Sequence, residues 1–192
     1  MADFFREKRE RIRARSLVVA TLNSVYVQLP ELAIFFGSLS KIIWSEETLP
    51  VAFSLSKNLR QIDTSLFDKV RENLLRFDVE LANAILAFEI RVLQLNRVAK
   101  EVAGNIAEDS PMASGRWKPA NVVNYLKLYS KYNSKQVEFA NAIGELAAKL
   151  RDQLFAKTKK IIVDWTNVDR LTEEAQVALA EIRSPVDAES QS

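Results

Sequence analysis

The chain contains no histidine and no cysteine. It therefore cannot build a Ser-His-Asp triad, a cysteine nucleophile, a thiolate or imidazole metal site, or a histidine-ligated haem. The di-metal sites of helical bundles normally combine glutamate with histidine, so they are disfavoured too. The lack of cysteine also means no disulfide framework, which favours a reducing compartment. We predict no catalytic residue, no metal, no cofactor and a cytoplasmic location.

Glycine and proline are also scarce, with 4 and 5 residues in a chain of 192. An all-β fold needs many tight turns and would use more of both, whereas the strong helix formers are abundant here. The length and the 48% hydrophobic composition suit one domain with one core. We therefore expect an all-α fold, with a single helical-bundle domain over residues 1–183 and a disordered tail over residues 184–192.

Two long series of apolar residues repeat at intervals of three and four, which is the spacing of one helix face. The first series covers residues 67–102 and the second covers residues 122–150. Pro119 suits the first position of a returning helix. The sequence thus predicts an elongated antiparallel bundle built on a long, coiled-coil-like helical hairpin, with helices at about 65–108 and 119–157.

An antiparallel pairing of the two series places Arg91 opposite Gln136, in a seam that is otherwise apolar. This layer is either a pair that fixes the register or a place where the seam opens to solvent.

The ends of the chain are expected to be helical as well. The apolar pattern before Trp44 keeps its phase across Pro30, which predicts one kinked N-terminal helix packed on the hairpin. Residues 159–165 contain a short β-branched run, for which we expect helix. A last helix is predicted over residues 171–183.

Small residues recur at every fourth position of the returning helix, at Ala140, Gly144 and Ala148. Such a row lets a neighbouring backbone come close. It predicts either a close helix crossing inside the bundle or a dimer contact.

Basic residues are concentrated near the N-terminus, ahead of a stretch over residues 16–40 whose only charged residue is Glu31. A basic flank before an apolar run is typical of a segment on the cytoplasmic side of a membrane. Aromatic residues close to the basic ones can insert at the level of the lipid headgroups. The predicted membrane-surface contacts are Phe4, Phe5, Arg6, Arg9, Arg11, Arg13 and Arg15.

Polar residues such as Asn23 and Gln28 interrupt the apolar stretch. Three interpretations of residues 17–44 therefore stay open: a buried core helix, which the composition favours, an interfacial helix, or a membrane-spanning helix.

A second basic surface is predicted on the returning helix, where Lys127, Lys131 and Lys135 share one face. Basic stripes near aromatic residues can bind phosphate backbones, but the formal net charge of +2 and the lack of a nucleic-acid motif argue against this use. The sequence resembles no family that we can name. It favours a non-enzymatic helical interaction or scaffold protein, with a protein partner or self-association, docked at the inner face of a membrane by its N-terminus. A nucleic-acid-binding module is the alternative, and an enzyme with carboxylate chemistry is the third.

Overall fold

The structure is a computed structural model that describes residues 2–107, 119–156 and 161–189. Throughout this part of the chain the regular secondary structure is helical. The helices are α1 (Ala2–Lys41), α2 (Leu49–Lys57), α3 (Ser65–Arg71), α4 (Val79–Asn105), α5 (Pro119–Leu128), α6 (Ser130–Phe155) and α7 (Thr166–Glu189), with 3-10 turns η1 (Glu46–Thr48) and η2 (Leu74–Arg76). The predicted all-α fold is confirmed.

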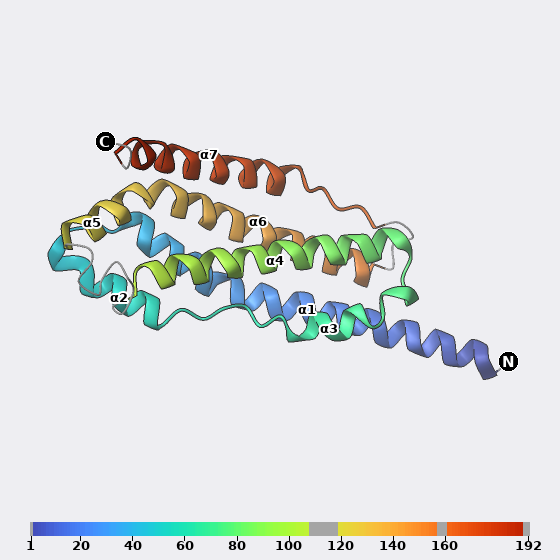
Figure 1. The fold of residues 1–192 in the computed structure, drawn as a ribbon. Coiled ribbons are helices and arrows are strands. Elements are labelled where there is room, and N and C mark those ends of the chain that lie inside the picture. The colour runs from blue at the N-terminus through green and yellow to red at the C-terminus, as the bar shows by residue number, and fades with distance from the viewer. Residues whose placement is uncertain (1, 108–118, 157–160, 190–192) are drawn as a thin grey trace.

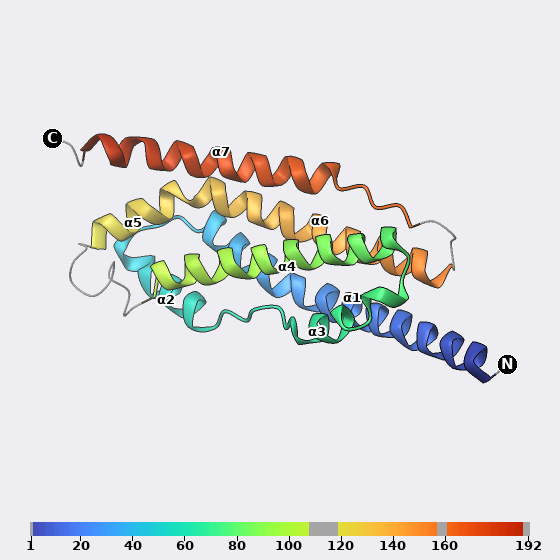
Figure 2. The same ribbon diagram turned by 45° about the vertical axis from the view of Figure 1, so that its right-hand side comes forward.

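The four long helices, α1, α4, α6 and α7, lie along one long axis (Figures 1 and 2). Helix α6 runs antiparallel to the other three, and α7 packs on the outer side of α6. The most extensive neighbour of α6 is α1 rather than α4. The bundle is therefore elongated and antiparallel as expected, but its closest helix pair is not the predicted hairpin.

One hydrophobic core runs through the bundle and joins nearly every helix. Burying a leucine or phenylalanine side chain contributes about 1.5–3 kcal/mol, so these residues dominate the stabilising side of the free energy of folding. The largest side chains that are almost wholly buried are Phe36, Phe67, Phe88, Leu32, Leu39, Leu81, Leu95, Ile106, Leu126, Ile143, Leu150 and Leu171.

The predicted helix over 65–108 is interrupted, because α3 ends at Arg71 and α4 begins at Val79. Two polar side chains bond to the backbone at the interruption. The Asn73 side-chain amide donates to the Lys69 carbonyl at 2.8 Å, and Asp78 Oδ1 accepts the Leu81 amide N–H at 2.8 Å. Asp78 therefore caps α4 and starts a new helix, although the apolar spacing continues across the break.

The other predicted helices differ from the structure mainly at their ends. Helix α1 continues through Pro30, so the predicted continuity of the N-terminal helix is confirmed. The returning helix divides at Tyr129 into α5 and α6, and α6 ends at Phe155, ahead of residues 157–160, which lie outside the described part. Helix α7 covers the predicted 171–183 and continues to Glu189, where a disordered tail was expected from residue 184. The helix continues past Pro185, which lies in its last two turns.

Helix was also expected for residues 159–165, and this prediction is wrong for residues 161–165, which have no regular secondary structure. The Gln153 side chain both accepts from the Ile162 amide at 2.8 Å and donates to the Ile162 carbonyl at 2.6 Å. Asp164 Oδ1 then accepts the Thr166 amide at 3.0 Å, where α7 begins. These bonds occupy the backbone groups that a helix would use.

Candidate functional site

The first turns of α1 project beyond the ends of α4 and α6 (Figures 1 and 2). Three large apolar side chains are solvent-exposed there: Phe4, Phe5 and Ile12 have relative exposures of 66%, 52% and 56%. The rings of Phe4 and Phe5 contact each other edge to face, with centroids 5.9 Å apart. The first core residue of α1 is Ala14, so the exposed segment covers about three turns.

A groove of about 730 Å³ runs between this segment and the α3–α4 connection. On the α1 side, Phe4, Lys8, Arg11 and Arg15 line the groove, and their spacing of four, three and four places them in one row along the helix. On the opposite side, the η2 turn contributes Leu75 and Arg76, and the Leu75 side chain is fully exposed. The site therefore combines a row of cations with an exposed apolar side chain at either wall.

Carboxylates neutralise some of these cations. Glu7 Oε1 lies 2.6 Å from Arg11 Nη2. Glu10 Oε2 lies 2.5 Å from Arg76 Nη1, and Glu10 Oε1 lies 3.3 Å from Arg6 Nε. Hydrogen bonds from Arg76 and Arg6 lower the pKa of Glu10. Glu10 therefore stays charged and ties α1 to the η2 turn.

Four other cations of the segment have no such partner. Among the side chains that the structure describes (residues 4–107, 120, 122–156 and 161–182), no carboxylate forms an ion pair with Lys8, Arg9, Arg13 or Arg15. Lys8 and Arg15 line the groove, whereas Arg9 and Arg13 do not. The exposed end of α1 thus carries an excess of positive charge, and part of that excess faces a concave surface.

The predicted small-residue row faces a second, shallow groove of about 1250 Å³ between α1 and α6. Ala140 is buried, and Gly144 is half-buried beside α1: a Cβ atom placed on it would lie 3.6 Å from Leu29 Cδ1. Exposed apolar side chains of α1, among them Val27 and Ile34, line the same groove. The row therefore lies at the contact of α1 with α6, with an apolar surface beside it.

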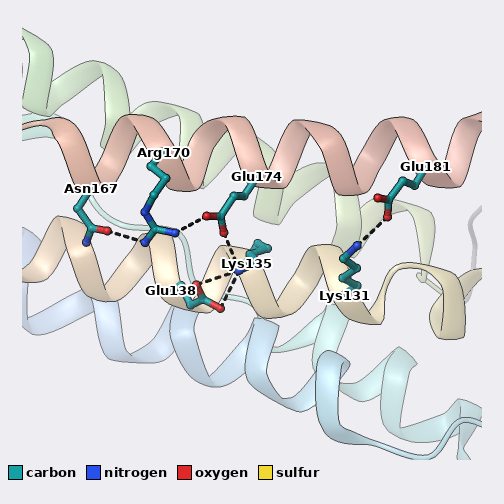
Figure 3. Close-up of polar contacts among 7 residues, drawn as sticks. All are labelled: Lys131, Lys135, Glu138, Asn167, Arg170, Glu174 and Glu181. Carbon is teal, nitrogen blue, oxygen red and sulfur yellow. Dashed lines mark hydrogen bonds and ion pairs between the residues drawn. The ribbon is translucent and has the colours of Figure 1, made fainter.

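Two of the three lysines of the predicted face, Lys131 and Lys135, lie between α6 and α7 and are ion-paired (Figure 3). Lys131 Nζ is 2.7 Å from Glu181, and Lys135 Nζ is 2.7 Å from Glu174 and 3.2 Å from Glu138. These bonds raise the pKa of Lys135, and the bond from Lys135 lowers the pKa of Glu174.

Arg170 adds a second cation to the same cluster by pairing with Glu174. Lys127 is exposed and has no ion pair among the described residues. Lys131 and Lys135 therefore carry little free positive charge and hold α7 on α6, whereas the charge of Lys127 remains exposed.

One carboxylate, Glu89 of α4, is buried. Burial raises its pKa, and Arg71 of α3, with Nε 3.4 Å from Glu89 Oε1, opposes that increase. This pair joins α3 to α4. In the described part of the chain, no three acidic side chains lie close enough together to hold a metal ion.

Helix α1 is also long and apolar enough to cross a membrane, with a mean hydropathy of 1.4 in its most apolar window over Phe4–Lys41. In the bundle, however, the apolar residues of this helix from Val18 to Leu39 are largely core residues. One face of residues 18–39 therefore belongs to the core, while Tyr26, Val27 and Ile34 on the other side are exposed.

Part of the candidate site could not be found from the sequence. The basic residues and Phe4 and Phe5 were recognisable from their concentration near the N-terminus. Leu75 and Arg76 were not, because the continuous apolar spacing assigned them to a long helix. The polar pair Asn73 and Asp78 was the available signal for the turn that brings them to α1.

No protein-family model matches this chain, and neither a curated protein nor a solved structure is significantly similar to it.

Proposed function

We propose that this protein is a non-enzymatic helical interaction protein that docks on an anionic membrane surface through the exposed end of α1. One observation carries the proposal: Phe4, Phe5 and Ile12 are exposed on a projecting helix end that also carries four cations without a carboxylate partner among the described side chains. Apolar insertion and attraction to anionic lipid are the two contributions that hold a peripheral helix at a membrane.

Charge supports the choice of an anionic surface. A basic residue near such a surface contributes roughly 1 kcal/mol of attraction. The whole chain has a formal net charge of only +2, so the concentration of unpaired cations at one end gives the molecule a preferred orientation. Because anionic lipids are concentrated in the cytoplasmic leaflet, we place the protein at the inner face of a membrane.

Docking by this end keeps the fold intact. The side chains that would contact lipid are already exposed, whereas insertion of the whole of α1 would remove Val18, Leu22 and Leu32 from the core. The bound bundle would extend away from the surface by the length of its helices and present α4, α6 and α7 to protein partners. This geometry suits a scaffold, and it argues for peripheral binding over a membrane span.

A flotation assay tests the proposal. Wild-type protein is mixed with phosphatidylcholine vesicles that contain phosphatidylserine, at low and at moderate salt. We expect the protein to float with the vesicles at low salt and less at moderate salt, because salt screens exposed charges. The triple variant Arg9→Gln, Arg11→Gln, Arg13→Gln should stay in solution while its melting temperature remains close to that of the wild type.

The matched control removes the same charge from the opposite end of the bundle. Lys41, Lys100 and Lys127 are exposed and have no ion pair among the described residues, and their joint replacement by Gln should leave flotation nearly unchanged. A wild-type protein that ignores anionic vesicles at low salt contradicts membrane docking. Equal loss of flotation in both triple variants shows attraction by net charge alone, without a docking face.

A further inference from the structure

We propose that the groove between α1 and the η2 turn is a headgroup site for lipids that carry a phosphomonoester. This inference rests on the proposed membrane docking and adds a ligand class to the same end of the molecule. It starts from the juxtaposition of Lys8 and Arg15 on α1 with Arg76 and Leu75 of the η2 turn around one concave surface.

The groove differs from the rest of the basic segment in shape. Arg9 and Arg13 are exposed and do not line the groove. Lys8 and Arg15 line a groove of about 730 Å³, which has the size of a small-ligand site. Two cations that line one groove and have no ion pair among the described side chains favour a ligand group with two negative charges.

A phosphomonoester has this property. It carries a charge of about −1.5 to −2 at neutral pH and three acceptor oxygens, whereas the phosphodiester of a common phospholipid carries a single charge. Arginine binds phosphate through two parallel hydrogen bonds, and lysine binds it as a point charge. Lys8 and Arg15 supply one of each.

The other two cations of the groove are ion-paired. Arg11 and Arg76 also line the groove, but Glu7 and Glu10 occupy part of their hydrogen-bonding capacity. Two carboxylates line the groove, Glu7 and Asp78. Asp78 accepts the Leu81 amide N–H as the cap of α4. The groove thus holds four cations against two carboxylates, both of which already bind partners on the protein.

The walls of the groove indicate that the phosphate belongs to a lipid rather than to a soluble metabolite. Phe4 lies at one wall, with 66% exposure, and Leu75 at the other, with full exposure. The walls of a metabolite pocket shield the ligand from solvent. These two exposed side chains do not shield the groove in this way. Both can enter the acyl boundary while a headgroup occupies the cations between them.

The experiment compares two vesicle types with equal zeta potential, one containing phosphatidic acid and the other phosphatidylserine in phosphatidylcholine. We expect the wild type to bind the phosphatidic acid vesicles at least about fivefold more tightly, since hydrogen bonds between charged groups are the strong ones. The double variant Lys8→Gln, Arg15→Gln should lose this preference and bind both vesicle types alike.

Arg9→Gln, Arg13→Gln is the matched control. It removes the same charge from the same three turns outside the groove, so it should weaken binding to both vesicles by the same factor and keep the preference. Thermal unfolding of both double variants checks that the bundle is intact.

A pH series gives an independent readout. When the two vesicle types are matched in zeta potential at each pH, the preference should grow from pH 6 to pH 8, because the phosphomonoester loses its second proton near pH 6. The chain has no histidine, the side chain whose ordinary pKa lies in this range. The α-amino group loses its positive charge as the pH rises, which would act in the opposite direction.

The outcomes separate this inference from the proposed function. Binding of the wild type to neither vesicle overturns membrane docking itself. Equal binding to both vesicles, or a preference that survives Lys8→Gln, Arg15→Gln, overturns the headgroup site and leaves docking in place. Displacement of the protein from phosphatidic acid vesicles by soluble glycerol phosphate at the same phosphate concentration shows a free phosphate ester as the ligand, and this also overturns a lipid site.

Discussion

Helix α1 is one continuous helix with two different environments. From Val18 to Leu39 its inner face is buried, with exposures of 1% at Val18, 2% at Leu22 and 0% at Leu39. From Phe4 to Arg13 the same helix carries apolar side chains of similar size that are more than half exposed. The difference comes from the neighbours and not from the residues, because α6 lies along the first part and ends before the second.

This contrast shows which apolar residues stabilise the fold. A phenylalanine removed from water contributes about 1.5–3 kcal/mol, whereas an exposed one contributes little to folding and remains available for a second contact. The mean hydropathy of α1 does not distinguish the two groups of residues, since it averages both parts of the helix. The exposure of each side chain in the bundle distinguishes them.

The largest expected effect compares two phenylalanines of α1. Phe36 is fully buried, and Phe36→Ala should reduce the free energy of unfolding by about 3–5 kcal/mol, the usual cost of truncating a buried phenylalanine. Phe4→Ala makes the same chemical change at an exposed site and should shift it by less than about 0.5 kcal/mol. Denaturant unfolding measures both. Similar losses in the two variants would show that the end of α1 is packed in solution.

The next effect tests the close contact that holds the buried part of α1 on α6. Gly144→Leu should destabilise the protein by about 1–3 kcal/mol, because the larger side chain crowds Leu29. Gly144→Ala is the control: its Cβ would lie at an ordinary contact distance, so the better helix propensity should stabilise the protein by up to about 1 kcal/mol. If both substitutions stabilise the protein equally, Leu29 does not limit the space at this position.

A smaller effect compares paired with unpaired cations. The folded-state pKa of Glu174 is lowered, so its ion pair with Lys135 stabilises the fold above the ordinary pKa of 4.5, and this stabilisation is lost as the pH falls through the lowered value. The pKa of Lys135 is also raised. At alkaline pH the stabilisation by this ion pair is therefore lost only as the pH rises above the ordinary lysine pKa of 10.5. Lys135→Gln should therefore lower the melting temperature at pH 7 and have little effect near pH 3.

Arg13→Gln is the control for that pH series, because Arg13 has no ion pair among the described residues. Its effect on the melting temperature should be close to zero at both pH values. A constant effect of Lys135→Gln across the series would mean that its aliphatic stem, and not its charge, holds α7.

Periodicity predicted the helical segments well and the neighbours of each helix poorly. The spacing of residues predicted the helical character of the chain, the continuity of α1 through Pro30 and the row of small residues, because each of these is a property of a single helix. It did not show that α6 packs most closely on α1, since several apolar faces of similar length can pair with one another.

The polar layer at Arg91 shows the same limit. Its predicted partner was Gln136, but Arg91 Nη2 lies 2.5 Å from Asp169 of α7, while Gln136 is buried. The carboxylate comes from a third helix, α7. A prediction that pairs only two apolar helix faces cannot include a residue of a third helix. The basic end of α1 was predictable because its residues are close together in the sequence. Arg76 contacts Glu10 there but lies 66 residues further along the chain, in the η2 turn.

The smallest expected effect on stability separates folding from docking at the exposed end of α1. Glu10 is the carboxylate that pairs with Arg6 and Arg76 there. Glu10→Gln should leave the melting temperature nearly unchanged, because exposed ion pairs contribute little to folding. The same change removes a negative charge from the docking surface and frees two cations, so binding to phosphatidylserine vesicles at low salt should increase about fivefold.

Glu145→Gln removes an exposed carboxylate on α6, outside that surface, and is the matched control. An equal increase in both variants would assign the attraction to net charge, and a large loss of melting temperature in Glu10→Gln would show that the exposed end of α1 is part of the fold.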